Sequence, residues 1–234
     1  MSTFIFDLDG TLADSRECLM ASLRHAFSSV GLKDHTFCPV LSLQRDLATT
    51  YSVTMAELSA ETEVESLQRF IFEFRWFHEA HGEDSIVAYD GIANTLDSLK
   101  RTHVLAVATT KHSPQARRVL RKLKLDRYFD HIQGTDAGMK YKPDPEILHK
   151  TLRILEIPAH KAAYVGDACH DMAAARAAGL TAIAAAYGFG GDQYLKDSEK
   201  DFMVYNHREL AEIRDQFLSR RTRDLAIRQR SASL

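Results

Sequence analysis

Two carboxylates, Asp7 and Asp9, follow directly on an apolar run that ends at Phe6, and Gly10 comes next. The apolar run predicts a buried strand. Carboxylates serve in proteins as ligands for hard metal ions, as nucleophiles and as proton carriers. Open α/β sheets bind their ligands beyond the carboxyl ends of the strands. We therefore expect chemistry at the end of this first strand.

Two structural alternatives exist for the same stretch. Asp-Gly is a common turn pair, and Asp-x-Asp-Gly also occurs in calcium-binding loops. An EF-hand loop needs a Glu at its twelfth position, and counting from Asp7 that position holds Cys18. The calcium-loop alternative is therefore weak, and a plain turn does not explain why two carboxylates follow a buried strand.

The elements that would hold these carboxylates alternate along the second part of the chain. Short apolar runs predict strands, and segments of about ten residues with helical spacing separate them. This alternation indicates an α/β fold, a Rossmann-like parallel sheet covered by helices on both faces. Further strands are predicted at 103–108, 131–133, 162–166 and 180–184, and helices at 92–100, 114–123, 146–155 and 170–178.

A purely helical segment separates the first strand from the rest of the sheet. Helical spacing of apolar residues predicts helices at 16–30, from Pro39 onward and at 63–81. We expect an α/β core domain formed by residues 1–15 and 86–234, whose basic tail from about 219 is frayed, with a helical domain inserted at 16–85.

The helix predicted at 63–81 carries aromatic residues on two faces. Phe70, Phe74 and Phe77 share one face, and Phe72 and Trp76 lie on another. Apolar residues on two faces indicate burial on both sides. The alternatives for the second side are the core of the small domain, a wall of the substrate site, and a contact with a second copy of the chain in a homodimer.

Composition narrows the class of protein. The 234-residue chain has a formal net charge of -2, which argues against general nucleic-acid binding. It has no apolar run of membrane-spanning length and no signal-peptide pattern, so we expect a cytoplasmic protein that does not enter a membrane. Three cysteines at unrelated spacings, without a Cys-x-x-Cys pair, predict free thiols.

Three further strand ends carry polar residues in register with the first pair. Thr109 ends one predicted strand, Lys142 lies in a Lys-Pro segment after the next, and Asp167 and Asp171 follow a third. In chain order they form the pattern Asp-x-Asp-Gly-Thr, Thr, Lys-Pro and Gly-Asp-x-x-x-Asp. This pattern resembles the four motifs of the haloacid dehalogenase superfamily of phosphatases. The helical insertion at 16–85 is similar to the cap of the phosphoglycolate phosphatase-like subgroup.

This resemblance implies a role for each residue. Asp7 is the nucleophile that forms an aspartyl-phosphate, and Asp9 protonates the leaving alcohol and then activates water. Thr109 and Lys142 hold and neutralise the phosphoryl oxygens. These four are the implied catalytic residues.

Magnesium is the implied cofactor. Its ligands would be Asp7, the backbone carbonyl of Asp9, and Asp167. Arg45, in the helical insertion, is a candidate for binding a substrate carboxylate or phosphate, with a surface arginine as the alternative. The supporting residues around the site are Gly10, Thr11, Thr110, Gly166 and Asp171, of which Thr110 stands where the family often has Asn.

The resulting expectation is a magnesium-dependent phosphatase that hydrolyses a small phosphorylated metabolite through an aspartyl-phosphate. Within the superfamily, a phosphomutase and a pyrophosphatase remain alternatives. Outside enzymes, the alternative is a regulatory protein that binds a metabolite without turnover. The complete set of polar residues at strand ends argues against this last reading.

Overall fold

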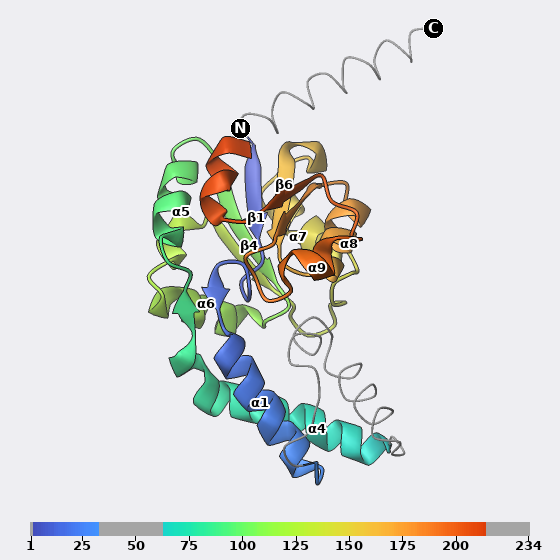
Figure 1. Ribbon diagram of the computed structural model, residues 1–234. Coiled ribbons are helices and arrows are strands. Elements are labelled where there is room, and N and C mark those ends of the chain that lie inside the picture. The colour runs from blue at the N-terminus through green and yellow to red at the C-terminus, as the bar shows by residue number, and fades with distance from the viewer. Residues whose placement is uncertain (1, 33–62, 214–234) are drawn as a thin grey trace, which may run out of the picture. The chain divides into compact units, whose positions relative to one another are not determined.

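The computed structural model describes residues 2–32 and 63–213, and the chain divides into two compact units (Figure 1). One unit consists of Met1–Leu12 with Ala88–Leu234, and the other is Ala13–Val87. No helix in the described part of the chain is long and apolar enough to cross a membrane.

Three features expected from the sequence lie outside the described residues. They are Arg45, the helix that was predicted from Pro39 onward, and the basic tail from about 219.

The larger unit is built on a six-stranded sheet in the order β5-β4-β1-β6-β7-β8, and every pair of neighbours is parallel. This confirms the predicted α/β class. Since β1 lies between β4 and β6, the strand that carries Asp7 is in the middle of the sheet. The strands are β1 (Thr3–Phe6), β4 (Val104–Thr109), β5 (His131–Gly134), β6 (Ala162–Gly166), β7 (Thr181–Ala185) and β8 (Phe202–Val204).

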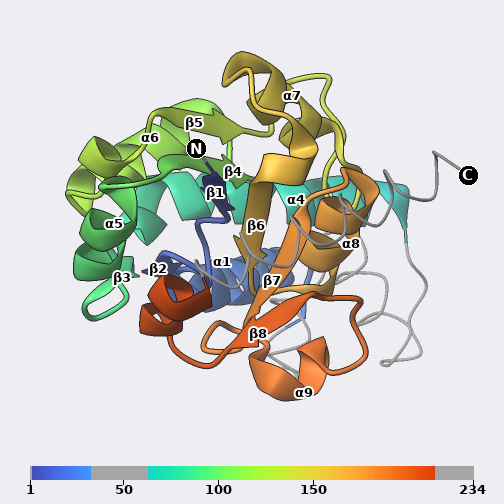
Figure 2. The ribbon, with the colours of Figure 1, turned by 90° about the horizontal axis from the view of Figure 1, so that it is seen from above.

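Helices cover both faces of this sheet, and Figure 2 shows α5 and α6 on one side with α7 and α8 on the other. Alternate residues of a strand face opposite sides, and because helices cover both sides, most strand side chains of both sets are apolar and buried. Ile5 and Tyr164, for example, join the core formed with α7 and α8. The helices are α5 (Ile92–Lys100), α6 (Ser113–Lys122), α7 (Glu146–Ile154), α8 (Cys169–Ala177) and α9 (Gly191–Leu195).

Short elements complete this unit. Single turns of 3-10 helix occupy Asp126–Tyr128, Ala159–Lys161 and His207–Glu209, and the chain is α-helical from Leu210 to the end of the described residues. The helical stretch at the end of the described residues thus begins with a 3-10 turn. Strand β8 was not predicted.

The smaller unit pairs two helices, α1 (Arg16–Ser29) and α4 (Val64–Phe77). Their apolar faces form a separate core. The predicted helix at 63–81 continues beyond α4 as a π-helix at His78–Gly82 and a 3-10 turn at Glu83–Ser85. Two short strands that were not predicted, β2 (Ala13–Asp14) and β3 (Val87–Ala88), form a second sheet.

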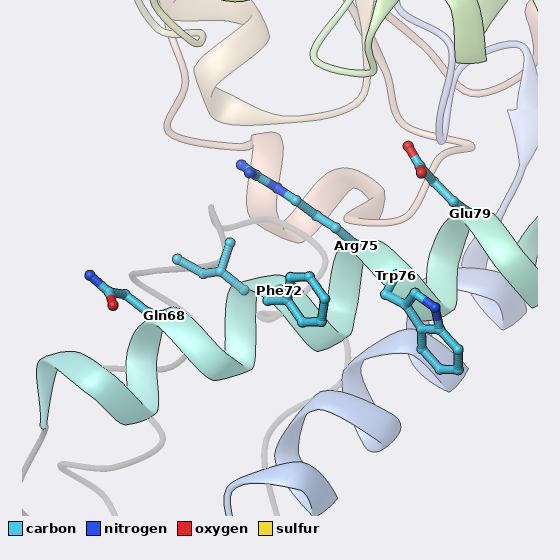
Figure 3. Close-up of a pocket in the computed structure, with 6 residues that line it drawn as sticks. Gln68, Phe72, Arg75, Trp76 and Glu79 are labelled. Atoms are coloured by element: carbon cyan, nitrogen blue, oxygen red, sulfur yellow. The ribbon is translucent and has the colours of Figure 1, made fainter.

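The two aromatic faces of α4 differ in burial. Phe70 and Phe74 are buried against α1, whereas Phe72 and Trp76 are 64% and 48% exposed. Phe72 and Trp76 border a hollow of about 410 Å³ on the surface of α4 (Figure 3). Within 2–32 and 63–213, the expected burial of this second face is therefore absent. The described residues that line the hollow are Gln68, Ile71, Phe72, Arg75, Trp76 and Glu79.

Candidate active site

The ends of three neighbouring strands bring the predicted site residues together. Asp7 follows β1 and its backbone N–H donates to the carbonyl of Val165 at 2.9 Å, which extends the pairing of β1 with β6 by one residue. Asp167 directly follows β6, and Thr109 is the last residue of β4 on the other side of β1. In a parallel sheet these ends meet at one edge.

Three carboxylates form the centre of the site. Oxygen atoms of Asp7, Asp167 and Asp171 lie within 4.8 Å of one another, and all three side chains are buried. Burial raises the pKa of Asp7 to about 7, and the neighbouring carboxylates add to the rise. Burial and the charge of Asp171 likewise raise the pKa of Asp167 well above its ordinary value. This cluster of carboxylates thus favours a positive charge beside it.

Lys142 supplies a cation at this centre. Its Nζ lies 3.1 Å from Oδ1 of Asp7 and 2.5 Å from Oδ1 of Asp171, and it donates to the hydroxyl of Tyr164 at 2.9 Å. Burial alone would lower the pKa of this ammonium, but the two carboxylates outweigh burial and raise it. Lys142 therefore stays charged. Burial also opposes ionisation of Asp171, yet Lys142 lowers the pKa of that carboxyl.

The geometry also distinguishes Lys142 from Lys140, two residues earlier in the chain. The side chain of Lys140 is 73% exposed and lies 3.4 Å from Asp144 in a surface ion pair. The side chain of Lys142 is fully buried against the carboxylates. Only the lysine that precedes Pro143 thus joins the cluster.

Asp9 lies beside Lys111, a cation that was not among the predicted site residues. Nζ of Lys111 is 3.1 Å from Oδ2 of Asp9, and the two side chains are 5% and 18% exposed. Lys111 comes two residues after Thr109, whose hydroxyl accepts a hydrogen bond from the Lys111 N–H at 3.3 Å. The sequence did offer one signal for Lys111, because it is a second polar residue beyond the end of β4.

The two supporting glycines lie where the backbone passes close to a carboxylate side chain. Gly10 has a φ of 78°, and a Cβ atom there would lie 2.2 Å from Oδ2 of Asp167. A Cβ atom at Gly166 would lie 2.5 Å from the side chain of Asp171. Both positions need glycine because the backbone passes directly against a carboxylate. Of the two supporting threonines, Thr11 is fully buried, whereas Thr110 is partly exposed.

The loop after β7 connects this strand to α9. It also encloses the site. The Tyr187 hydroxyl donates to the carbonyl of Thr11 at 3.0 Å, and the Phe189 N–H donates to Oδ2 of Asp167 at 2.8 Å. Between them, a Cβ atom at Gly188 would lie 2.3 Å from Cβ of Asp167. We call Tyr187, Gly188 and Phe189 the 187–189 strap.

The donor set of this centre fits a hard divalent cation. Its side-chain ligands are carboxylate oxygens, which Mg²⁺ prefers. A cation bound there would offset the mutual repulsion that contributes to the raised pKa values of Asp7 and Asp167. Both oxygens of Asp171 are engaged, Oδ1 by Lys142 and Oδ2 by the Ala168 N–H, so Asp7 and Asp167 are the carboxylates best suited to hold the ion.

Comparisons with known proteins agree with this architecture. A family model described as haloacid dehalogenase-like hydrolase matches residues 4–185. The pyrophosphatase PpaX of Bacillus anthracis (strain CDC 684 / NRRL 3495) is 27% identical over 214 residues, which cover 91% of this chain and 96% of that protein.

Solved structures show the same fold. A predicted phosphatase from Clostridium acetobutylicum has a TM-score of 0.78 at 28% identity and covers 90% of this chain and 96% of its own. A predicted phosphoglycolate phosphatase from Haemophilus somnus 129pt has a TM-score of 0.79 at 21% identity, with 91% and 97% covered.

Proposed function

The chain belongs to the haloacid dehalogenase-like hydrolases, and from this premise we propose that it is a magnesium-dependent phosphatase of small phosphorylated metabolites. One observation carries the proposal. The buried Asp7 carboxylate lies at the end of the central strand, 3.1 Å from the Lys142 ammonium and within 4.8 Å of a carboxylate oxygen of Asp167. A nucleophile that attacks a phosphate dianion needs neutralising charge of this kind around it.

In the proposed reaction, an oxygen of Asp7 attacks phosphorus, the bond to the leaving oxygen breaks, and an aspartyl-phosphate forms. Lys142 neutralises charge on the phosphoryl oxygens, and the Thr109 hydroxyl donates to one of them. Mg²⁺, held by Asp7, Asp167 and the backbone carbonyl of Asp9, would contribute charge neutralisation at the phosphoryl group. Asp171 keeps Lys142 charged and in place.

Asp9 is the proposed proton carrier of both steps. Its carboxyl gives a proton to the leaving oxygen in the first step. The resulting carboxylate then takes a proton from the water that attacks the aspartyl-phosphate. Orthophosphate leaves and Asp7 is regenerated. Asp9 is less buried than Asp7, as a group that meets substrate and water requires.

The helical unit Ala13–Val87 is the proposed cap. In this role it would close over the bound substrate and exclude bulk water during transfer. The exposed aromatic face of α4, with Phe72 and Trp76, is available for a substrate wall or a homodimer contact. Arg45, from the same insertion, remains the proposed binding group for an anionic part of the substrate.

A second candidate is hydrolysis of inorganic pyrophosphate, whose phosphoanhydride would be attacked by the same Asp7. The likeness to the pyrophosphatase PpaX favours it, because that likeness covers nearly the whole of both chains. The same nucleophile and the same phosphoryl contacts serve an ester and an anhydride, since only the leaving group differs.

Phosphate release from a panel of substrates tests the proposal. The panel contains phosphoglycolate, pyrophosphate, sugar phosphates and nucleotides, each with Mg²⁺ and with a chelator, for the wild type and Asp7→Asn. Asp97→Asn, at a 57% exposed carboxylate on α5, is the matched control and should behave as wild type. Release that needs both Mg²⁺ and Asp7 supports a hydrolase. Isomerisation of a sugar phosphate without release would indicate a mutase, and tight binding without turnover a regulatory protein.

A further inference from the structure

Lys111 is a buried cation to which the proposed reaction assigns no task. Its side chain is 5% exposed and its Nζ lies 3.1 Å from Oδ2 of Asp9. The loop that carries it is anchored, because the carbonyl of Lys111 accepts a hydrogen bond from the Thr135 N–H at 3.1 Å. A Cβ atom at Gly134 would lie 2.3 Å from the same carbonyl. The loop is therefore packed too closely for Lys111 to be a surface charge that happens to point inward.

The two lysines of the site serve different carboxylates. Lys142 contacts Asp7 and Asp171, on the side of the nucleophile. Lys111 contacts Asp9, the proposed acid, which must face the oxygen that departs from phosphorus. Because the leaving oxygen remains joined to the rest of the leaving group, Lys111 flanks that group rather than the transferred phosphoryl group.

We infer that Lys111 binds the leaving group and selects substrates whose leaving group carries a negative charge of its own. This inference rests on the proposed function, because it needs Asp9 to face the leaving oxygen. An ammonium has three donors, so Lys111 can contact Asp9 and an anionic leaving group at the same time. The side chains of Lys111 and Asp9 are largely buried, and an ion contact in such a place is stronger than one at the surface. A neutral alcohol offers Lys111 no such partner.

Two substrate chemistries meet this requirement. In inorganic pyrophosphate the leaving group is itself a phosphate, and in the phosphate ester of a small hydroxy acid it carries a carboxylate. Neutral sugars and simple alcohols do not meet it. The feature that both share is an anion a few bonds from the scissile oxygen. Separate assays of the two substrates show whether that anion is a phosphate or a carboxylate.

The test compares leaving groups at constant phosphoryl chemistry. We would measure kcat and KM of the wild type, Lys111→Met and Lys111→Arg on pyrophosphate, phosphoglycolate and, as the neutral control, ethyl phosphate. Met keeps the length of the side chain and removes the charge, whereas Arg keeps the charge. Thermal unfolding verifies that each variant is folded. Mg²⁺ affinity by calorimetry should be unchanged, since Lys111 is not a proposed ligand of the ion.

The expected result is selective. Lys111→Met should lower kcat/KM for the anionic leaving groups on the order of 10- to 100-fold more than for ethyl phosphate, as expected for loss of a charged hydrogen bond. Much of this loss in kcat/KM should appear as a higher KM. Lys111→Arg should retain part of the preference for anionic leaving groups. Greater loss on pyrophosphate than on phosphoglycolate, or the reverse, identifies which anion is bound.

Other results would overturn the inference. An equal fall for charged and neutral leaving groups would mean that Lys111 only positions Asp9. A wild type that prefers ethyl phosphate would equally exclude an anion-selecting role. If Lys111→Met does not fold, the same comparison is made with Lys111→Arg and Lys111→Gln. Failure of the wild type to release phosphate from any substrate is a distinct outcome, since it overturns the proposed function itself and the inference with it.

Discussion

Substitution of Gly188 by alanine tests whether the 187–189 strap positions the proposed metal ligand. The backbone of Gly188 lies outside the left-handed region, so alanine adds no backbone strain there. The added Cβ atom would lie 2.3 Å from Cβ of Asp167 and 2.4 Å from the carbonyl oxygen of Gly10. Ordinary contacts of a Cβ atom begin at 3.4 Å. Asp167 or the strap must therefore move by roughly 1 Å, judged by normal packing distances.

The expected losses of stability, rate and metal affinity follow from this displacement. Overpacking of a buried site costs about 1–3 kcal/mol of unfolding free energy. A misplacement of about 1 Å near reacting groups costs on the order of 100-fold in rate. Disturbing the groups that orient a metal ligand weakens metal affinity by about 10- to 100-fold. We expect Gly188→Ala to show all three effects, with Mg²⁺ affinity reduced in the folded protein.

Calorimetric titration with Mg²⁺ and steady-state kinetics measure these effects on protein shown to be folded by circular dichroism. Gly31→Ala is the matched control. Gly31 has a φ of 84°, and among the described residues other than its chain neighbours no atom lies within 4 Å of an added Cβ, so alanine there costs about 1 kcal/mol through the backbone. It should leave kcat and Mg²⁺ affinity intact. Wild-type Mg²⁺ affinity and kcat in folded Gly188→Ala would refute the positioning role of the strap.

Three further predictions concern stability. Lys142→Met should cost about 3–5 kcal/mol near neutral pH in urea unfolding, because Asp7 and Asp171 would be left buried without their cation; a loss below about 1 kcal/mol would contradict this estimate. Without Mg²⁺, the free energy of unfolding should fall as pH rises from about 4 to about 7. The reason is that folding raises the pKa of Asp7 from 3.8 to about 7, so protonation of Asp7 stabilises the folded state fully only below the lower of these values. Added Mg²⁺ should raise the free energy of unfolding by an amount that grows over that pH interval. Asp7→Asn should flatten the dependence of the free energy of unfolding on pH, and an unchanged dependence would contradict the prediction. Tyr187→Phe should cost about 1 kcal/mol in thermal unfolding, because the Thr11 carbonyl loses its donor; an unchanged melting temperature would argue against that hydrogen bond.

Local patterns predicted much of the sheet and its helices. The helix expected at 92–100 is α5 with the same bounds, and the apolar runs before Asp7 and Asp167 are β1 and β6. These elements are long or apolar enough for periodicity to identify them. Because consecutive parallel strands end at one edge, the clustering of the acidic residues followed from the same prediction.

The elements that were missed depend on contacts distant in sequence. Strand β8 (Phe202–Val204) is a short edge strand that exists through its pairing with β7. The position of Lys111 beyond a strand end marks it as a candidate site residue, but its pairing with Asp9 joins the ends of two different strands and appears only in the folded chain. The strap shows the same limit, because its glycine is needed only once Asp167 has been placed against it.

The central claim is that Asp7 becomes covalently phosphorylated, and chemical trapping tests it most directly. Single-turnover reactions with substrate labelled in the phosphoryl group are quenched in acid and the protein is digested. Our account predicts transient label on the peptide that contains Asp7, in the presence of Mg²⁺ and not in Asp7→Asn. Rapid Mg²⁺-dependent turnover with no labelled peptide at any quench time, or label on another residue, would contradict it.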